Sequence, residues 1–177
     1  MPMKFQKLLK LYSGFLAHCE KAGPGKKQLP FFAKILDTKT GVEMDKRILI
    51  VDDEVDLCEI LGFLFESDKW IVQTASNGVA ALQLVDSFSP HVILSDINMP
   101  DMDGLQLLET LFNKNLDIPV ILLTGFRDNQ KMQKAWMNCA YDFMDKPFKK
   151  DELIMLANNA FKFGADYVRF ARKRYNK

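Results

Sequence analysis

Residues 47–54 read RILIVDDE, an apolar run that ends abruptly in three acidic residues. The apolar part is rich in β-branched side chains, which favour an extended backbone. Because its apolar residues are continuous and do not alternate with polar ones, both faces of the strand are expected to be buried, as in a parallel sheet with helices on both sides. The stretch therefore predicts a buried strand with the carboxylates of Asp52, Asp53 and Glu54 at its carboxyl end.

The same combination of strand and helix recurs along the chain. Short apolar runs predict strands at residues 47–51, 70–74, 91–95, 118–123 and 140–144. Amphipathic stretches predict helices at residues 54–66, 78–88, 104–113 and 127–137, and a long last helix that starts near Lys150. Asp103, just before the third helix, is expected to be its N-cap. The alternation predicts an α/β fold with a doubly wound, five-stranded parallel sheet.

Polar side chains follow the predicted strands at one edge of this sheet. Asp52 and Asp53 follow the first strand, Asp96 the third, Thr124 the fourth and Lys146 the fifth. In open α/β sheets the functional site lies outside the carboxyl ends of the strands. Clustered carboxylates repel one another unless a cation neutralises them, and hard oxygen ligands with few neutral donors suit Mg²⁺. A carboxylate can also attack phosphorus to give an aspartyl phosphate, which a nearby lysine would hold.

Four motifs in this order resemble the receiver domains of two-component signalling proteins. They are ILIVDDE at residues 48–54, SDINMP at residues 95–100 with Gly104, LTG at residues 123–125, and DKPF at residues 145–148. The resemblance covers roughly residues 45–160. It implies a flavodoxin-like sheet with the strand order 2-1-3-4-5.

The resemblance also implies a role for each matching position. Asp96 would be the phosphoacceptor, and Mg²⁺ would be bound by Asp52, Asp53, Asp96 and the backbone carbonyl of Asn98. Thr124 would be the switch hydroxyl, Lys146 would pair with the phosphoryl group, and Phe143 would be the aromatic switch residue. The family holds this lysine through a cis peptide bond, which is plausible before Pro147. By strand alternation, Tyr141 is expected on the same face as Phe143.

The two ends of the chain differ from the middle. Residues 1–43 and residues 161–177 each carry a net charge of +5, whereas residues 44–160 carry −9. Residues 1–43 predict a basic helical extension, and Met44 looks like the natural start of a receiver domain spanning residues 44–160. Residues 161–177 continue the last helix with an apolar stripe that includes Phe163, Tyr167 and Phe170. This stripe is expected to dock either on the 1–43 extension or on a second subunit; a solvated basic tail is the alternative.

These observations predict a cytoplasmic protein, since hydrophobic residues make up 48%, no apolar run approaches the roughly 20 residues of a membrane span, and no signal peptide is evident. The resemblance implies a phosphorylation-activated switch that is not a conventional enzyme. Its partners would be a histidine kinase or phosphotransfer protein and a downstream target protein, with a homodimer through the extensions as a further alternative and DNA binding disfavoured. Two other functions remain open. One is a degenerate receiver that acts as an interaction scaffold, and the other is a haloacid-dehalogenase-type phosphatase, which would need an aspartate where Asn98 stands.

Overall fold

The computed structural model describes residues 45–125 and 129–175. Each strand is followed by a helix, as the alternating sequence pattern predicts. The strands are β1 (Lys46–Val51), β2 (Trp70–Ala75), β3 (Val92–Asp96), β4 (Val120–Thr124) and β5 (Asp142–Asp145). The helices are α3 (Val55–Ser67), α4 (Gly78–Phe88), α5 (Gly104–Asn113), α6 (Asn129–Met137) and α7 (Lys150–Tyr175).

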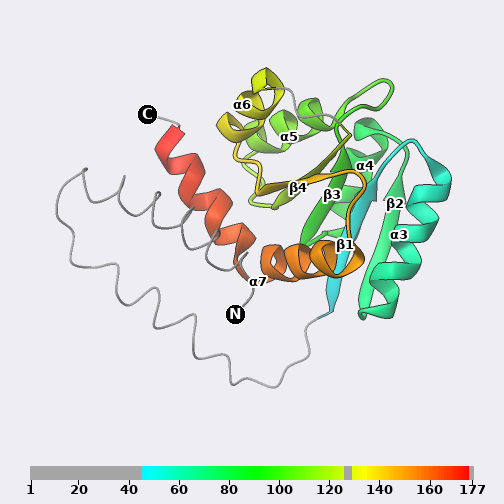
Figure 1. Cartoon of the computed structure of the whole chain (residues 1–177). Helices are drawn as coiled ribbons and strands as arrows, with labels where there is room; N and C mark the ends of the chain where they lie inside the picture. Colours follow the sequence, from blue (N-terminus) through cyan, green and yellow to red (C-terminus); the bar gives the residue numbers. More distant parts are fainter. Residues whose placement is uncertain (1–44, 126–128, 176–177) are drawn as a thin grey trace, which may run out of the picture. The chain divides into compact units, whose positions relative to one another are not determined.

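The five strands form one parallel sheet in the order β2-β1-β3-β4-β5, as the sequence predicts. Helices cover both faces of this sheet (Figure 1). Helices α4, α5 and α6 pack on one face around Leu49, Leu107 and Leu122. Helices α3 and α7 pack on the other face around Ile50, Phe65 and Leu153. Residues 48–51 of β1 and all of β3 and β4 are buried, which explains the continuous apolar runs in their sequences.

Two strand boundaries differ from the prediction. Strand β4 begins at Val120 and not at Ile118, because the preceding Pro119 has no N–H to donate to a ladder. Strand β5 begins at Asp142, since Cys139 has a positive φ of 62° and the N–H of Ala140 still bonds back to helix α6. Tyr141 therefore precedes the strand, and the prediction that it shares a face with Phe143 is wrong. The two side chains pack on opposite faces of the sheet.

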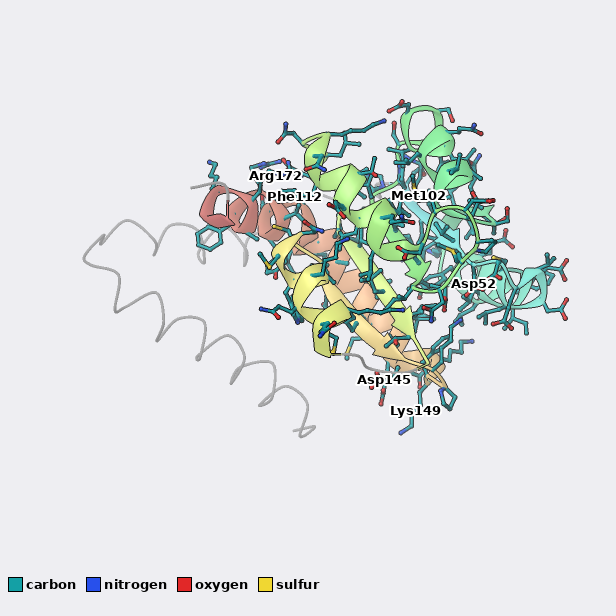
Figure 2. All side chains as sticks on the ribbon, turned by 90° about the horizontal axis from the view of Figure 1, so that it is seen from above. Asp52, Met102, Phe112, Asp145, Lys149 and Arg172 are labelled. Carbon is teal, nitrogen blue, oxygen red and sulfur yellow. The ribbon has the colours of Figure 1, made fainter. Side chains whose placement is uncertain are left out.

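Helix α7 is 26 residues long, and its second half packs on the α/β domain itself. Val168 and Ala171 are buried against Cys139, with Phe112 beside them. At Gly164 the helix meets the loop before β4, where an added Cβ would lie 2.5 Å from the Cβ of Pro119. Phe163 and Phe170 of the predicted stripe are exposed, and their docking on residues 1–43 or on a second subunit stays a prediction. Figure 2 shows Arg172, near the end of α7, beside Phe112 of helix α5.

The expectations for residues 1–43 fall outside the described residues. This applies to the helical extension, to its packing against the last helix, to Met44 as the natural start, and to a homodimer through the extensions. Among the residues that the structure describes, no helix is both long and apolar enough to cross a membrane.

Candidate functional site

The carboxyl ends of the strands bring the predicted site residues together. Asp52 directly follows β1, while Asp96 and Thr124 are the last residues of β3 and β4. Asp96 pairs with Leu123 across the sheet, which places Thr124 one residue beyond it on the neighbouring strand. Asp52 is 2% exposed, Asp96 is 7% exposed and Thr124 is 2% exposed. Buried carboxylates are costly to charge unless they are paired, so their partners decide what this site can do.

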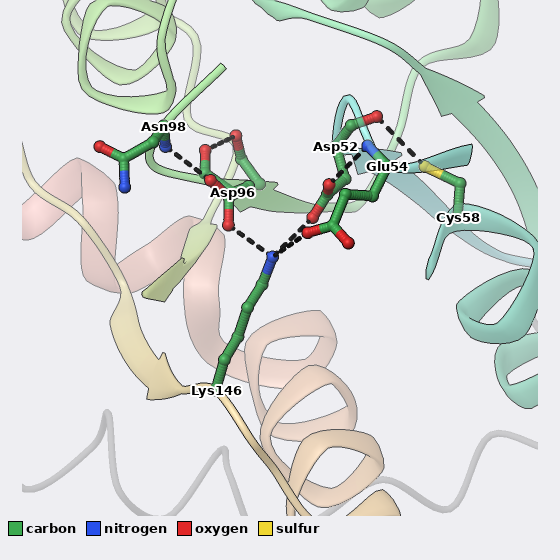
Figure 3. Close-up of polar contacts among 7 residues, drawn as sticks. Asp52, Glu54, Cys58, Asp96, Asn98 and Lys146 are labelled. Atoms are coloured by element: carbon green, nitrogen blue, oxygen red, sulfur yellow. Dashed lines mark hydrogen bonds and ion pairs between the residues drawn. The ribbon is translucent and has the colours of Figure 1, made fainter. Parts of the chain in front are cut away.

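The partner of both carboxylates is Lys146, which follows β5 (Figure 3). Its Nζ atom lies 2.6 Å from Oδ1 of Asp96 and 2.9 Å from Oδ2 of Asp52. Oε1 of Glu54, a largely exposed side chain, lies 3.8 Å from the same Nζ atom. One ammonium group therefore lies between carboxylates from two adjacent strands, β1 and β3.

The other carboxylate oxygens accept hydrogen bonds from the backbone. Oδ2 of Asp96 accepts from the N–H of Asn98 at 2.6 Å, and Oδ1 of Asp52 accepts from the N–H of Glu54 at 2.9 Å. Charge-assisted hydrogen bonds of this kind stabilise the ionised carboxylate. Asp52 and Asp96 are thus held in fixed orientations at the edge of the sheet.

Burial lowers the pKa of Lys146, but hydrogen bonds and charge from Asp96 and Asp52 outweigh it, so the net shift of this pKa is upward. The lysine accordingly stays protonated at neutral pH. Beneath the site, the thiol of Cys58 donates to the backbone oxygen of Asp52 at 3.4 Å. Burial and the charge of Asp52 raise the pKa of this thiol, so it remains uncharged.

Local sequence explains how the site is shaped. The N–H of Gly104 donates to the carbonyl oxygen of Ile97 at 3.0 Å, and a Cβ at position 104 would collide with the carbonyl oxygen of Asp96. Only glycine allows helix α5 to begin so close to the end of β3. As predicted, Asp103 caps this helix in a capping box with Gln106. The peptide bond between Lys146 and Pro147 is cis, also as predicted.

The predicted metal ligands do not all lie at the same depth. Asp52 and Asp96 converge on Lys146, whereas Asp53 and Asn98 are exposed at the rim. In the described part of the chain, no group of three or more His, Cys, Asp or Glu side chains forms a ready metal site. Two converging carboxylates nevertheless fit Mg²⁺, because this ion commonly takes one or two carboxylates and completes its sphere with water and phosphate oxygens.

Phe143, the predicted switch residue, lies on β5 opposite Leu122 and is buried. Trp136 of helix α6 covers it, with the ring centroids 5.1 Å apart. A second contact reaches the site from α6, since Nζ of Lys131 donates to Oδ1 of Asn98 at 2.8 Å. Sequence reasoning missed both Trp136 and Lys131, because neither follows a strand and no motif marks them.

Comparison with protein families finds a match. The model of the response regulator receiver domain matches residues 48–158, which include every predicted site residue. The regulatory protein AtoC of Escherichia coli K12 is 37% identical over 114 residues, which are 64% of this chain and 25% of AtoC. An uncharacterised 14.6 kDa protein of Leptolyngbya boryana is 35% identical over 120 residues, which are 67% of this chain and 90% of that protein.

Solved structures agree with the sequence comparisons. The receiver domain of the Francisella response regulator 1452 has a TM-score of 0.63 and 30% identity, and the match covers 67% of this chain and 98% of that one. The receiver domain of NtrX from Brucella abortus has a TM-score of 0.60 and 32% identity, and the match covers 65% and 98%. The chain spans about a quarter of the length of the first curated relatives that it matches, so only their receiver portions bear on it.

Proposed function

Because this chain belongs to the response regulator receiver family, we propose that it is a phosphorylation-activated switch whose phosphoacceptor is Asp96. The observation that carries the proposal is the Lys146 ammonium between the buried carboxylates of Asp96 and Asp52. A lysine in this place can neutralise the phosphoryl oxygens that arrive on Asp96. The phosphodonor would be a histidine kinase or a phosphotransfer protein.

The proposed phosphorylation of Asp96 needs few groups from the protein. A carboxylate oxygen of Asp96 attacks phosphorus, the bond from phosphorus to the donor atom breaks, and the donor keeps that electron pair. Phosphoryl transfer depends mainly on positioning and on charge stabilisation. Asp96 is already positioned by the N–H of Asn98, and Lys146 supplies positive charge at 2.6 Å. Thr124, buried at the end of the next strand, is the proposed switch hydroxyl.

Mg²⁺ would be held by Asp52, Asp53 and Asp96 together with the backbone carbonyl of Asn98. When bound, the ion would neutralise charge that develops on the transferred phosphoryl oxygens. Lys146 shares Asp52 and Asp96 with the proposed metal, so binding of the ion requires the lysine contacts to adjust.

The output would be a contact with a downstream protein through α6, β5 and α7. The support is the position of Phe143 on β5, directly beneath Trp136 of α6. One relative, the DNA-binding transcriptional regulator NtrC of Escherichia coli K12, carries DNA binding in its name. The aligned residues are only 24% of NtrC, and we do not extend DNA binding to this chain. A phosphorylation-independent scaffold remains the alternative. The intact set of Asp52, Asp96 and Lys146 argues against it, and Asn98 argues against a haloacid-dehalogenase-type phosphatase.

The test is incubation of the full chain with acetyl phosphate and Mg²⁺, followed by intact mass measurement. One phosphoryl group should add to the wild-type protein and none to Asp96→Asn, whose side chain has the same shape but cannot act as the nucleophile. Asp101→Asn is the matched control, since Asp101 is an exposed aspartate in the same loop. Undiminished incorporation in Asp96→Asn would refute Asp96 as the acceptor. No incorporation in the wild type, even from a histidine kinase, would favour the scaffold.

A further inference from the structure

The side chain of Asn98 connects helix α6 to the buried carboxylate of Asp96. The backbone N–H of Asn98 donates to Oδ2 of Asp96 at 2.6 Å. Oδ1 of the same asparagine accepts from Nζ of Lys131 at 2.8 Å, although the two residues are 33 positions apart in the sequence. A chain of two hydrogen bonds therefore links α6, through Asn98, to the proposed phosphoacceptor.

Asn98 and Lys131 are exposed, whereas Asp96 is almost fully buried. The pair thus lies on the solvent side of the site. Water from solvent would hydrolyse a phosphoryl group on Asp96. The water oxygen bonds to phosphorus as the bond from phosphorus to the Asp96 oxygen breaks, and that electron pair returns to Asp96 as its carboxylate. The proton that the water loses leaves with inorganic phosphate or solvent.

We propose that Lys131 is a positioning residue that slows this hydrolysis by holding the side chain of Asn98. The inference rests on the proposed function, because it concerns a phosphoryl group on Asp96. A hydrogen bond from an ammonium group is stronger than one from water, so Lys131 keeps Oδ1 of Asn98 occupied. When this oxygen is released, it can accept a hydrogen bond from the attacking water and orient that water toward phosphorus.

A second lysine on the same helix supplies the matched control. Lys134 lies three residues after Lys131, is also exposed, and pairs with Oε2 of Glu109 on α5 at 2.8 Å. Both lysines tie α6 to a neighbouring part of the molecule, but of the two only Lys131 is seen to bond to Asn98. Lys134→Ala therefore measures what the loss of a lysine from α6 does without disturbing the asparagine.

The experiment measures the lifetime of the phosphorylated full-length chain. The protein is phosphorylated with acetyl phosphate and Mg²⁺, the donor is removed, and the phosphorylated mass is followed over time. Lys131→Ala should shorten the half-life about twofold to tenfold, the rate equivalent of one oriented hydrogen bond. Lys134→Ala should leave the half-life unchanged, and Lys131→Arg should restore most of it because arginine can also donate to Oδ1.

The effect of Lys131→Ala on the half-life should also depend on Asn98. In an Asn98→Ala background, Lys131→Ala should change the half-life no further, which a general loosening of α6 would not predict. An unchanged or longer half-life in Lys131→Ala, or an undiminished effect without Asn98, would overturn the inference and leave the proposed function intact. If the wild type takes up no phosphate from any donor, both fail together.

Discussion

The ring of Trp136 on α6 meets the ring of Phe143 on β5 edge to face, with centroids 5.1 Å apart and an interplanar angle of 67°. Phe143 is 6% exposed, and Trp136 is partly open to solvent. Edge-to-face pairs of this kind add roughly 0.5–1.5 kcal/mol beyond the area they bury. The indole therefore covers the proposed switch residue and lies at the proposed output surface.

This contact should make Trp136 a reporter of phosphorylation. The chain has two tryptophans, and Trp70 is buried on the other face of the sheet against Phe65. In a Trp70→Phe background, acetyl phosphate with Mg²⁺ should change the intensity or wavelength of the Trp136 emission, because movement of Phe143 alters the surroundings of the indole. The change should vanish in Asp96→Asn. If emission stays constant while mass measurement shows full phosphorylation, Phe143 does not move on activation.

Lys146 and Mg²⁺ are expected to compete for the same carboxylates. Lys146→Met leaves Asp52 and Asp96 close together without their shared cation. In the absence of Mg²⁺ this substitution should lower the unfolding free energy by roughly 1–3 kcal/mol. The loss should be smaller than for a fully buried ion pair, because the lysine is partly solvated. Added Mg²⁺ should then raise the urea midpoint more in Lys146→Met than in the wild type. Lys149→Met, at a lysine whose side chain is 83% exposed, is the control and should match the wild type. Equal Mg²⁺ stabilisation of the wild type and Lys146→Met would show that lysine and metal do not compete.

The convergence of Asp52, Asp96 and Lys146 could be predicted from the sequence because each residue ends or follows a recognisable strand. A parallel sheet brings the carboxyl ends of its strands to one edge, so the order of strands suffices to place these side chains. Lys131 and Trp136 could not be predicted in this way. Their contacts depend on how α6 is rotated about its axis and on how its side chains extend, and helical periodicity leaves both open.

The docking of α7 shows a second limit of sequence patterns. The hydrophobic pattern indicated an aromatic stripe, including Phe163 and Phe170, for docking on another segment or subunit, and it did not predict that α7 also packs on the α/β domain itself. This contact is made at Gly164 and Val168, and the helix passes so close to Pro119 that no larger side chain fits at position 164. Close packing selected the small residues, and hydrophobicity alone does not reveal such a constraint.

The end of α7 should depend on Arg172 for its stability. Its guanidinium donates to Oδ1 of Asp117 at 2.7 Å and to the carbonyl oxygen of Leu116 at 2.8 Å, and it lies over the ring of Phe112. Arg172 is 8% exposed, so Arg172→Met should lower the unfolding free energy by about 1–3 kcal/mol, chiefly by leaving the Leu116 oxygen and Asp117 without this donor.

Urea denaturation of the full chain would measure the effect of Arg172→Met. Arg172→Lys should recover only part of the loss, since one ammonium cannot reproduce the planar fork of the guanidinium. Lys173→Met, at an exposed position next in the sequence, should behave like the wild type. If Arg172→Met and Lys173→Met are equally stable, this ion pair contributes nothing to the docking of α7.

His91 should make stability depend on pH near neutrality. Burial lowers the pKa of His91 from its ordinary value of 6.5, and the charge of Arg47 lowers it further. Nδ1 of His91 accepts from the N–H of Arg47 at 3.1 Å, and its ring meets the ring of Phe161, so the neutral form is the one that fits. A histidine with a lowered pKa binds its proton more weakly in the folded state than in the unfolded state. The contribution of His91 to stability is therefore fully present above pH 6.5 and is lost as the pH falls through the folded pKa.

The urea midpoint should decrease as the pH is lowered from about 7.5 to about 5.5. His91→Asn keeps an acceptor but has no titrating group, so it should flatten that decline. An unchanged slope in His91→Asn would assign the decline to other groups.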